Sequence, residues 1–112
     1  MIARTWHGIT PAEKADEYFG YLQESGVKAY RATEGNRGVY VLRRLEGDRA
    51  HFLLITFWDS WEPIRAFAGE DFERARYFPR DADFLLEFEP NVTQYEILAT
   101  PDVSFSASRN ET

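Results

Sequence analysis

The chain contains two histidines and no cysteine, so few residue types are available for acid–base or metal chemistry. Because imidazole titrates close to neutral pH, His7 is the leading candidate for a general base. The alternative is a strand-end histidine at the surface or bonded within the packing. His51 starts a predicted strand beside a turn, where it is expected to be exposed or at a subunit interface. The two residues are 44 positions apart with no third ligand motif, which does not predict a metal site.

Arg76 and Tyr77 offer adjacent donors for a negatively charged group. The Tyr77 hydroxyl can donate to an oxyanion, and the Arg76 guanidinium can pair with a carboxylate or phenolate. The structural alternatives are a Tyr77 hydroxyl in water and an ion pair between Arg76 and Glu73 or Asp71.

Length and charge narrow the function classes. The 112 residues are enough for one domain, and the net charge of −6 argues against a nucleic-acid binder, which needs a basic surface. No apolar run reaches the ~20 residues that span a bilayer, and the N-terminal sequence lacks a signal-peptide pattern. A cytoplasmic protein is expected.

Aromatic residues make up 16 % of the chain, which favours a partner subunit or an aromatic-lined pocket.

The first half of the chain predicts a strand followed by a helix. Ile2–Ile9 is rich in β-branched and aromatic residues. Thr10–Glu13 matches a capping box with proline at the first helical position, and Gly26 is the expected end of that helix. Val27–Arg37 is expected to be mostly a connection.

The second half predicts a hairpin, a broken helix and a last strand. Asp59-Ser60 offers a helix start after the hairpin, and Gly69 a stop. Glu89, at the break before the last strand, is expected to be an ordinary surface residue. The expected elements are strands Val39–Leu45, His51–Trp58 and Val92–Ala99, helices after Ser60 and over Asp71–Phe78, and one turn at Phe84–Phe88.

This order is β-α-β-β-α-β, which predicts an α+β, ferredoxin-like fold with a four-stranded antiparallel sheet and helices on one face. Residues 1–100 form the predicted domain and 101–112 a polar tail, expected to be frayed or draped over a neighbour.

The strand over His51–Trp58 predicts a second copy. Both of its alternating sets are largely apolar, although the helices can cover only one face of such a sheet. A two-fold homodimer packed sheet to sheet would cover the other face. The alternative is a central strand with a modest exposed patch.

Three segments resemble the antibiotic biosynthesis monooxygenase-like family: Phe57–Ser60, Ala66-Phe67 and Phe72–Phe78. The resemblance covers about residues 1–99 and implies a dimeric α+β barrel. It implies a cofactor-independent monooxygenase acting on a small aromatic or polyketide-like substrate. The family also includes haem-degrading enzymes and proteins of no known activity, so a non-catalytic small-molecule-binding dimer is the alternative.

The haem-degrading branch of this family carries an Asn, a Trp and a His iron ligand where this chain has Thr5, Phe67 and Arg76. A guanidinium stays protonated and cannot ligate iron, so haem binding is disfavoured unless His7 or His51 substitutes.

The family resemblance places the ligand cavity between the sheet and its own helices. Alternation along the first strand puts Ala3, Thr5 and His7 on one face, which we assign to this cavity. We expect no metal and no cofactor. The predicted site has His7 as base and Tyr77 as oxyanion donor, with Thr5, Trp58, Trp61, Phe67, Phe72 and Arg76 binding the substrate. Packing alone is the alternative for Trp61, Phe67 and Phe72.

Overall fold

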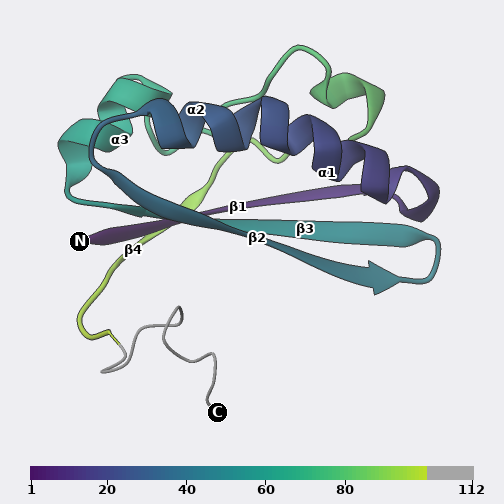
Figure 1. Cartoon of the computed structure of the whole chain (residues 1–112), viewed down its shortest axis with the longest axis horizontal. Coiled ribbons are helices and arrows are strands. Elements are labelled where there is room, and N and C mark those ends of the chain that lie inside the picture. Colours follow the sequence, from purple (N-terminus) through teal and green to yellow (C-terminus); the bar gives the residue numbers. More distant parts are fainter. Residues whose placement is uncertain (101–112) are drawn as a thin grey trace.

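The computed structural model describes residues 1–100. Four antiparallel strands form one sheet in the order β2-β3-β1-β4. Figure 1 shows the helices on one side of this sheet. The predicted α+β, ferredoxin-like architecture is therefore confirmed, while the predicted tail over 101–112 lies outside the described residues. The strands are β1 (Ile2–Pro11), β2 (Asn36–Glu46), β3 (Arg49–Trp58) and β4 (Thr93–Glu96).

The hairpin of β2 and β3 follows the prediction closely. The turn between the strands contains Gly47, whose φ of 60° is in the region that glycine favours. In β3 the even-numbered residues from Phe52 to Trp58 are buried against the helices, and the odd-numbered residues face the other way, half-buried. The sequence predicted that both faces of this strand need cover, and the structure shows that the even-numbered set faces the helices.

The helical layer differs from the prediction at its start. Thr10 and Pro11 still belong to β1, and no side chain caps the short 3-10 turn over Ala12–Lys14, so the predicted capping box is wrong. Helix α1 covers Ala15–Glu24. The chain breaks at Ser25 and continues as α2.

Helix α2 (Gly26–Ala32) replaces the predicted connection. Gly26 starts this helix rather than ending α1. A Cβ at Gly26 would lie 3.8 Å from the Phe78 ring and 3.9 Å from the Tyr30 ring, so the residue is in close contact with both the helix and a distant loop. Helix α3 (Trp61–Ala68) ends at Gly69 as predicted.

The segment from Gly69 to Val92 is largely without regular structure. Asp71–Phe78 is not helical, because its backbone bonds to distant residues instead: Ala75 N–H donates to Pro90 O over 2.8 Å. The turn expected at Phe84–Phe88 is replaced by a 3-10 turn at Asp81–Asp83. The last strand, β4, is shorter than predicted and pairs only with Ile2–Thr5.

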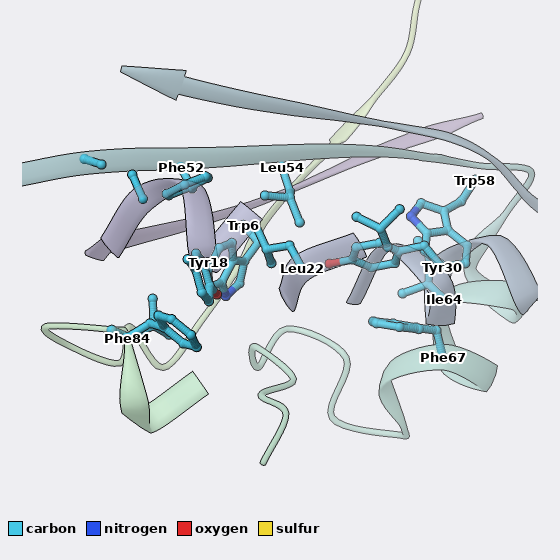
Figure 2. Close-up of a cluster of buried hydrophobic side chains, with 14 of the residues drawn as sticks. Trp6, Tyr18, Leu22, Tyr30, Phe52, Leu54, Trp58, Ile64, Phe67 and Phe84 are labelled. Atoms are coloured by element: carbon cyan, nitrogen blue, oxygen red, sulfur yellow. The ribbon is translucent and has the colours of Figure 1, made fainter. Parts of the chain in front are cut away.

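The core between the sheet and the helices is unusually aromatic. Figure 2 shows Phe52, Leu54 and Trp58 projecting from β3 towards Tyr18, Tyr30 and Phe67. Trp58 and Tyr18 have no exposed surface. No helix in residues 1–100 is both long and apolar enough to cross a lipid bilayer.

Candidate functional site

The space between the sheet and the helices contains a small interior pocket. Its volume is about 20 Å³, room for about one water molecule. The lining residues are Trp6, Tyr18, Leu22, Gly26, Tyr30, Leu54, Arg76, Phe78 and Asp81. Tyr30 extends from α2 with its hydroxyl pointing towards Leu22, into the centre of the cluster (Figure 2).

A buried arginine lies close to Tyr30 of the pocket wall, although it does not line the pocket itself. Arg4 is 2 % exposed, and its Nη2 donates to the carbonyl oxygens of Phe72 and Arg74 at 3.2 and 3.1 Å. Its Nε has no acceptor, and no ion pair involving Arg4 is found within residues 1–100. Burial lowers the pKa of Arg4. The fold therefore holds a cation in its interior without a carboxylate beside it.

Arg76 places a second cation at the mouth of the pocket. Its Nη1 donates to Phe67 O at 2.9 Å, and its guanidinium stacks over the rings of Phe67 and Phe78. The predicted pairing with Glu73 or Asp71 is not formed. Arg4 also lies over Phe67, 5.7 Å from the ring centre, so the Phe67 ring contacts two cations.

Two phenols and a carboxyl complete the polar groups of the interior pocket. Burial raises the pKa of Tyr30 to about 12, although Arg4 and Arg76 favour its ionised form. Tyr18 donates to Asp81 Oδ1 at 3.1 Å, and Phe78 N–H donates to Asp81 Oδ2 at 2.6 Å. Burial raises the pKa of Asp81, and these two hydrogen bonds oppose the shift.

Tyr77 lies at the edge of this site. Its ring packs edge-on against Trp6, with ring centres 6.2 Å apart, and its hydroxyl donates to the carbonyl oxygen of Glu89. Burial raises the pKa of Tyr77. The indole N–H of Trp6 lies towards the Tyr77 hydroxyl and opposes this shift in pKa, although it does not reach hydrogen-bond geometry.

The prediction that Thr5 and His7 face the helix-side cavity is wrong. In the first half of β1 the buried residues are Ile2, Arg4 and Trp6, and alternation places Ala3, Thr5 and His7 on the opposite face. Thr5 donates to Thr93 O at 3.2 Å, beside an exposed edge of the sheet.

The structure brings together only part of the predicted substrate set. Phe67 and Arg76 are beside the interior pocket, and Trp58 is packed behind it against Tyr30. Trp61 is 40 % exposed and packs on Phe72, which places both outside the pocket lining.

On the face opposite the helices, the two histidines form part of a hydrogen-bonded chain of side chains. We call this set of four residues, Glu46, His51, His7 and Glu89, the imidazole chain. Glu46 Oε1 lies 2.9 Å from His51 Nε2, and His51 Nδ1 lies 3.1 Å from His7 Nε2. His7 Nδ1 lies 2.5 Å from Glu89 Oε2. Glu89 is therefore a partner of His7 rather than the ordinary surface residue expected from the sequence.

An open hollow of about 340 Å³ adjoins the imidazole chain. Leu42 and Leu53 form its apolar floor, and Arg44 lies at its side, 3.4 Å from Glu46. Sequence reasoning did not identify Arg4, Tyr30, Asp81 or Glu89. A lone arginine in an otherwise apolar set of strand residues is the one signal that would have pointed to Arg4.

No family model and no curated protein matches the sequence. Among solved structures, the fold is similar to that of a MhuD mutant crystallised with two manganese protoporphyrin IX molecules bound per active site. The TM-score is 0.59 at 17 % sequence identity, and the match covers 92 % of this chain and 100 % of that chain. The two chains share a fold. The fold comparison therefore leaves porphyrin binding open, although the sequence disfavoured it.

Proposed function

We propose that this chain is an antibiotic biosynthesis monooxygenase-like protein that binds a small aromatic acid at the interior pocket and oxygenates it. The fold and the sequence resemblance support the family. The observation that carries the substrate class is Arg4, a cation that is 2 % exposed and has no carboxylate partner in the described residues. Burying an unpaired charge costs several kcal/mol, and an anionic ligand would offset that cost.

The ligand would enter by displacing the segment over Phe72–Arg74. The pocket itself has room for about one water, and this segment is held to β1 by the Arg4 guanidinium. A ligand carboxylate or phenolate accepts more strongly than a backbone carbonyl, so it competes for the same Nη2 donor. Arg76 at the mouth attracts the same anion.

Asp81 is the proton acceptor that this arrangement favours. Its raised pKa makes its carboxylate a better base than an exposed aspartate, and it lines the pocket. A substrate phenol would transfer its proton to Asp81, and a ring carbon of the resulting electron-rich anion would attack dioxygen to form a peroxide anion. The peroxide would take the proton back from Asp81, and loss of water, with the hydrogen of that ring carbon, would leave one oxygen atom as a quinone carbonyl. The substrate itself supplies the electrons. His7 cannot serve this pocket, because it lies on the other face of the sheet. Tyr77 stays a candidate donor at the pocket edge.

The test measures binding and oxygen uptake with hydroxynaphthoquinol-type substrates. Arg4→Met is expected to weaken binding of the acid at least tenfold, whereas Arg37→Met, at an exposed arginine paired with Asp59, leaves it unchanged. Asp81→Asn is expected to keep binding and lose oxygen uptake. Equal binding of the acid by Arg4→Met and the parent would refute the substrate class. Binding without oxygen uptake by the parent would leave the non-catalytic alternative.

Porphyrin binding is the second candidate, favoured by the bound groups of the similar MhuD structure. A porphyrin carries carboxylates that suit Arg4 and Arg76. Against this, the residues lining the interior pocket include no imidazole, so iron would find no histidine ligand there. A haemin titration followed by absorbance decides: a Soret shift that Arg4→Met abolishes supports this candidate, and no shift removes it.

A second copy is part of the proposal, because the sheet face opposite the helices carries large apolar side chains. Tyr40 and Leu42 are 43 % and 45 % exposed, and Leu53, Ile55 and Phe57 lie between them and β1. A patch of this kind on a 13.1 kDa chain favours sheet-to-sheet packing of two copies. Sedimentation is expected to give twice the chain mass at micromolar concentration.

A further inference from the structure

The two histidines are held so that one nitrogen of each ring faces the other. His7 Nδ1 and His51 Nε2 point outward to Glu89 and Glu46. A carboxylate only accepts hydrogen bonds, so both outward nitrogens carry the protons. In neutral imidazoles the inward nitrogens, His7 Nε2 and His51 Nδ1, then both present lone pairs, although they are 3.1 Å apart. Two facing lone pairs repel each other at this distance, and either a proton or a metal ion between them relieves the repulsion.

We propose that His7 and His51 bind a divalent transition-metal ion through these inward nitrogens. Zinc–imidazole bonds of about 2.0–2.1 Å put two nitrogens of a tetrahedral site about 3.3 Å apart, and a right-angled pair about 2.9 Å apart. The separation of 3.1 Å falls between these values. Imidazole suits zinc, copper and nickel, so the ion belongs to this group rather than to calcium or magnesium.

The two glutamates act as positioning residues for the metal ligands. Metal-binding histidines commonly donate their other ring N–H to a carboxylate, which fixes the tautomer and the ring orientation. Both imidazoles here have such a partner. Glu46 and Glu89 also bring two negative charges. Of the two arginines that line the hollow, Arg44 lies 3.4 Å from Glu46 and Arg43 is paired with Asp16 at 2.7 Å, so the surroundings keep a net negative charge that favours a cation.

The other coordination positions are open. No group of three or more His, Asp or Glu side chains suited to a metal occurs in residues 1–100, so the protein supplies two ligands. The hollow beside the histidines has a volume of about 340 Å³. In the single chain it leaves room for water or for an oxygen donor of a small acidic ligand, which Arg44 would attract. The second copy proposed above would cover the same face, including Leu42 and Leu53, and in that dimer enclosed water would supply the remaining ligands. This site is on the opposite sheet face from the interior pocket, so either proposal can fail without the other.

The experiment exploits the fact that the chain has two histidines and no cysteine. Tag-free protein is titrated with Zn²⁺ by calorimetry, and Cu²⁺-loaded protein is examined by electron paramagnetic resonance for couplings to imidazole nitrogens. We expect saturable Zn²⁺ binding and two imidazole nitrogens per chain on copper. No Zn²⁺ binding at millimolar concentration, or a copper spectrum without two coupled nitrogens, would overturn the proposal.

Matched variants separate ligation from folding, which far-UV circular dichroism monitors. His7→Gln and His51→Gln are each expected to abolish the two-nitrogen copper signature. Glu89→Gln retains both imidazoles and is expected to weaken Zn²⁺ binding about 10- to 100-fold. Glu24→Gln, at an exposed carboxylate at the end of α1, is the control and is expected to bind like the parent. Equal binding by Glu89→Gln and the parent would contradict the positioning role, and equal binding by both histidine variants would contradict ligation.

Discussion

Gly8 of β1 is required because the Trp6 indole lies directly over it. A Cβ at position 8 would lie 2.3 Å from Trp6 Cη2 and 2.9 Å from Trp6 Cζ2, both inside van der Waals contact. The indole is 7 % exposed and packed against Tyr77, so it cannot swing into solvent without losing that packing. Gly8→Ala is therefore an overpacking substitution.

The size of the effect follows from two opposing contributions. Overpacking a core typically costs about 1–3 kcal/mol. Replacing a strand glycine by alanine stabilises the protein by about 0.5–1 kcal/mol, because the unfolded chain then has less conformational entropy to lose. We expect a net loss of about 1 kcal/mol or more, which corresponds to a fall in Tm of about 4 °C or more. Urea unfolding followed by circular dichroism measures it.

Gly20 supplies the matched control. It lies inside α1, and a Cβ there would meet nothing within 4 Å. Gly20→Ala is expected to stabilise the protein by about 1 kcal/mol, since alanine is the better helix former. The same substitution thus has opposite signs at the two positions.

A second background tests the stated cause. Trp6→Phe removes the indole atoms that would clash with the added methyl group at position 8, so Gly8→Ala is expected to be neutral or stabilising in that background. The coupling between the two sites is then about 1–2 kcal/mol. If Gly8→Ala costs the same in both backgrounds, contact with the Trp6 ring is not the reason for glycine at this position.

Three further predictions concern buried polar groups and the sheet face. Because burial raises the pKa of Asp81, protonated Asp81 contributes to the free energy of unfolding. This contribution is full below the unfolded-state pKa and is lost as the pH rises through the folded-state pKa. The free energy of unfolding of the parent relative to Asp81→Asn, measured in urea, should therefore fall across that pH range and not rise. Thr56 accepts the Trp58 indole N–H at 2.7 Å, so Thr56→Val is expected to cost about 1–3 kcal/mol in urea unfolding, whereas Thr56→Ser keeps the acceptor and costs clearly less. Ile55→Lys, on the face opposite the helices, is expected to give particles of single-chain mass in sedimentation, and a mass unchanged from the parent would contradict sheet-to-sheet packing.

The position of β3 was predictable from its run of aromatic and aliphatic residues, but both of its alternating sets are largely apolar, so its sequence does not say which set faces the helices. The face of β1 was assigned wrongly because both of its sets are mixed. Arg4 interrupts the buried set, while Ile9 adds an apolar residue to the set that contains Thr5 and His7. The alternation of apolar and polar residues does not identify the buried face of a strand when one of the buried positions holds a cation.

The segment Asp71–Phe78 shows a different limit. Its apolar residues have helical spacing, but its backbone groups bond to Arg4, Pro90 and Val92, which are distant in the sequence. Tertiary contacts therefore override the local pattern. The approach of His7 to His51 depends in the same way on the register of β1 against β3, in which His51 pairs with Ile9, and no local sequence pattern specifies that register.

Glu89 is the residue that joins the two faces of the sheet. Its backbone carbonyl accepts the Tyr77 hydroxyl beside the interior pocket, and its carboxylate contacts His7 on the opposite face. A ligand that displaces Phe72–Arg74 also disturbs Tyr77, and through the Glu89 carbonyl it alters the support of His7. Because Glu89→Gln changes the side chain and keeps the carbonyl, it removes the carboxylate from the imidazole chain while leaving the Tyr77 hydrogen bond in place. Glu89 therefore connects the two proposed sites through its own backbone and side chain. The Glu89→Gln substitution separates their effects, because it changes the contact to His7 and not the contact to Tyr77.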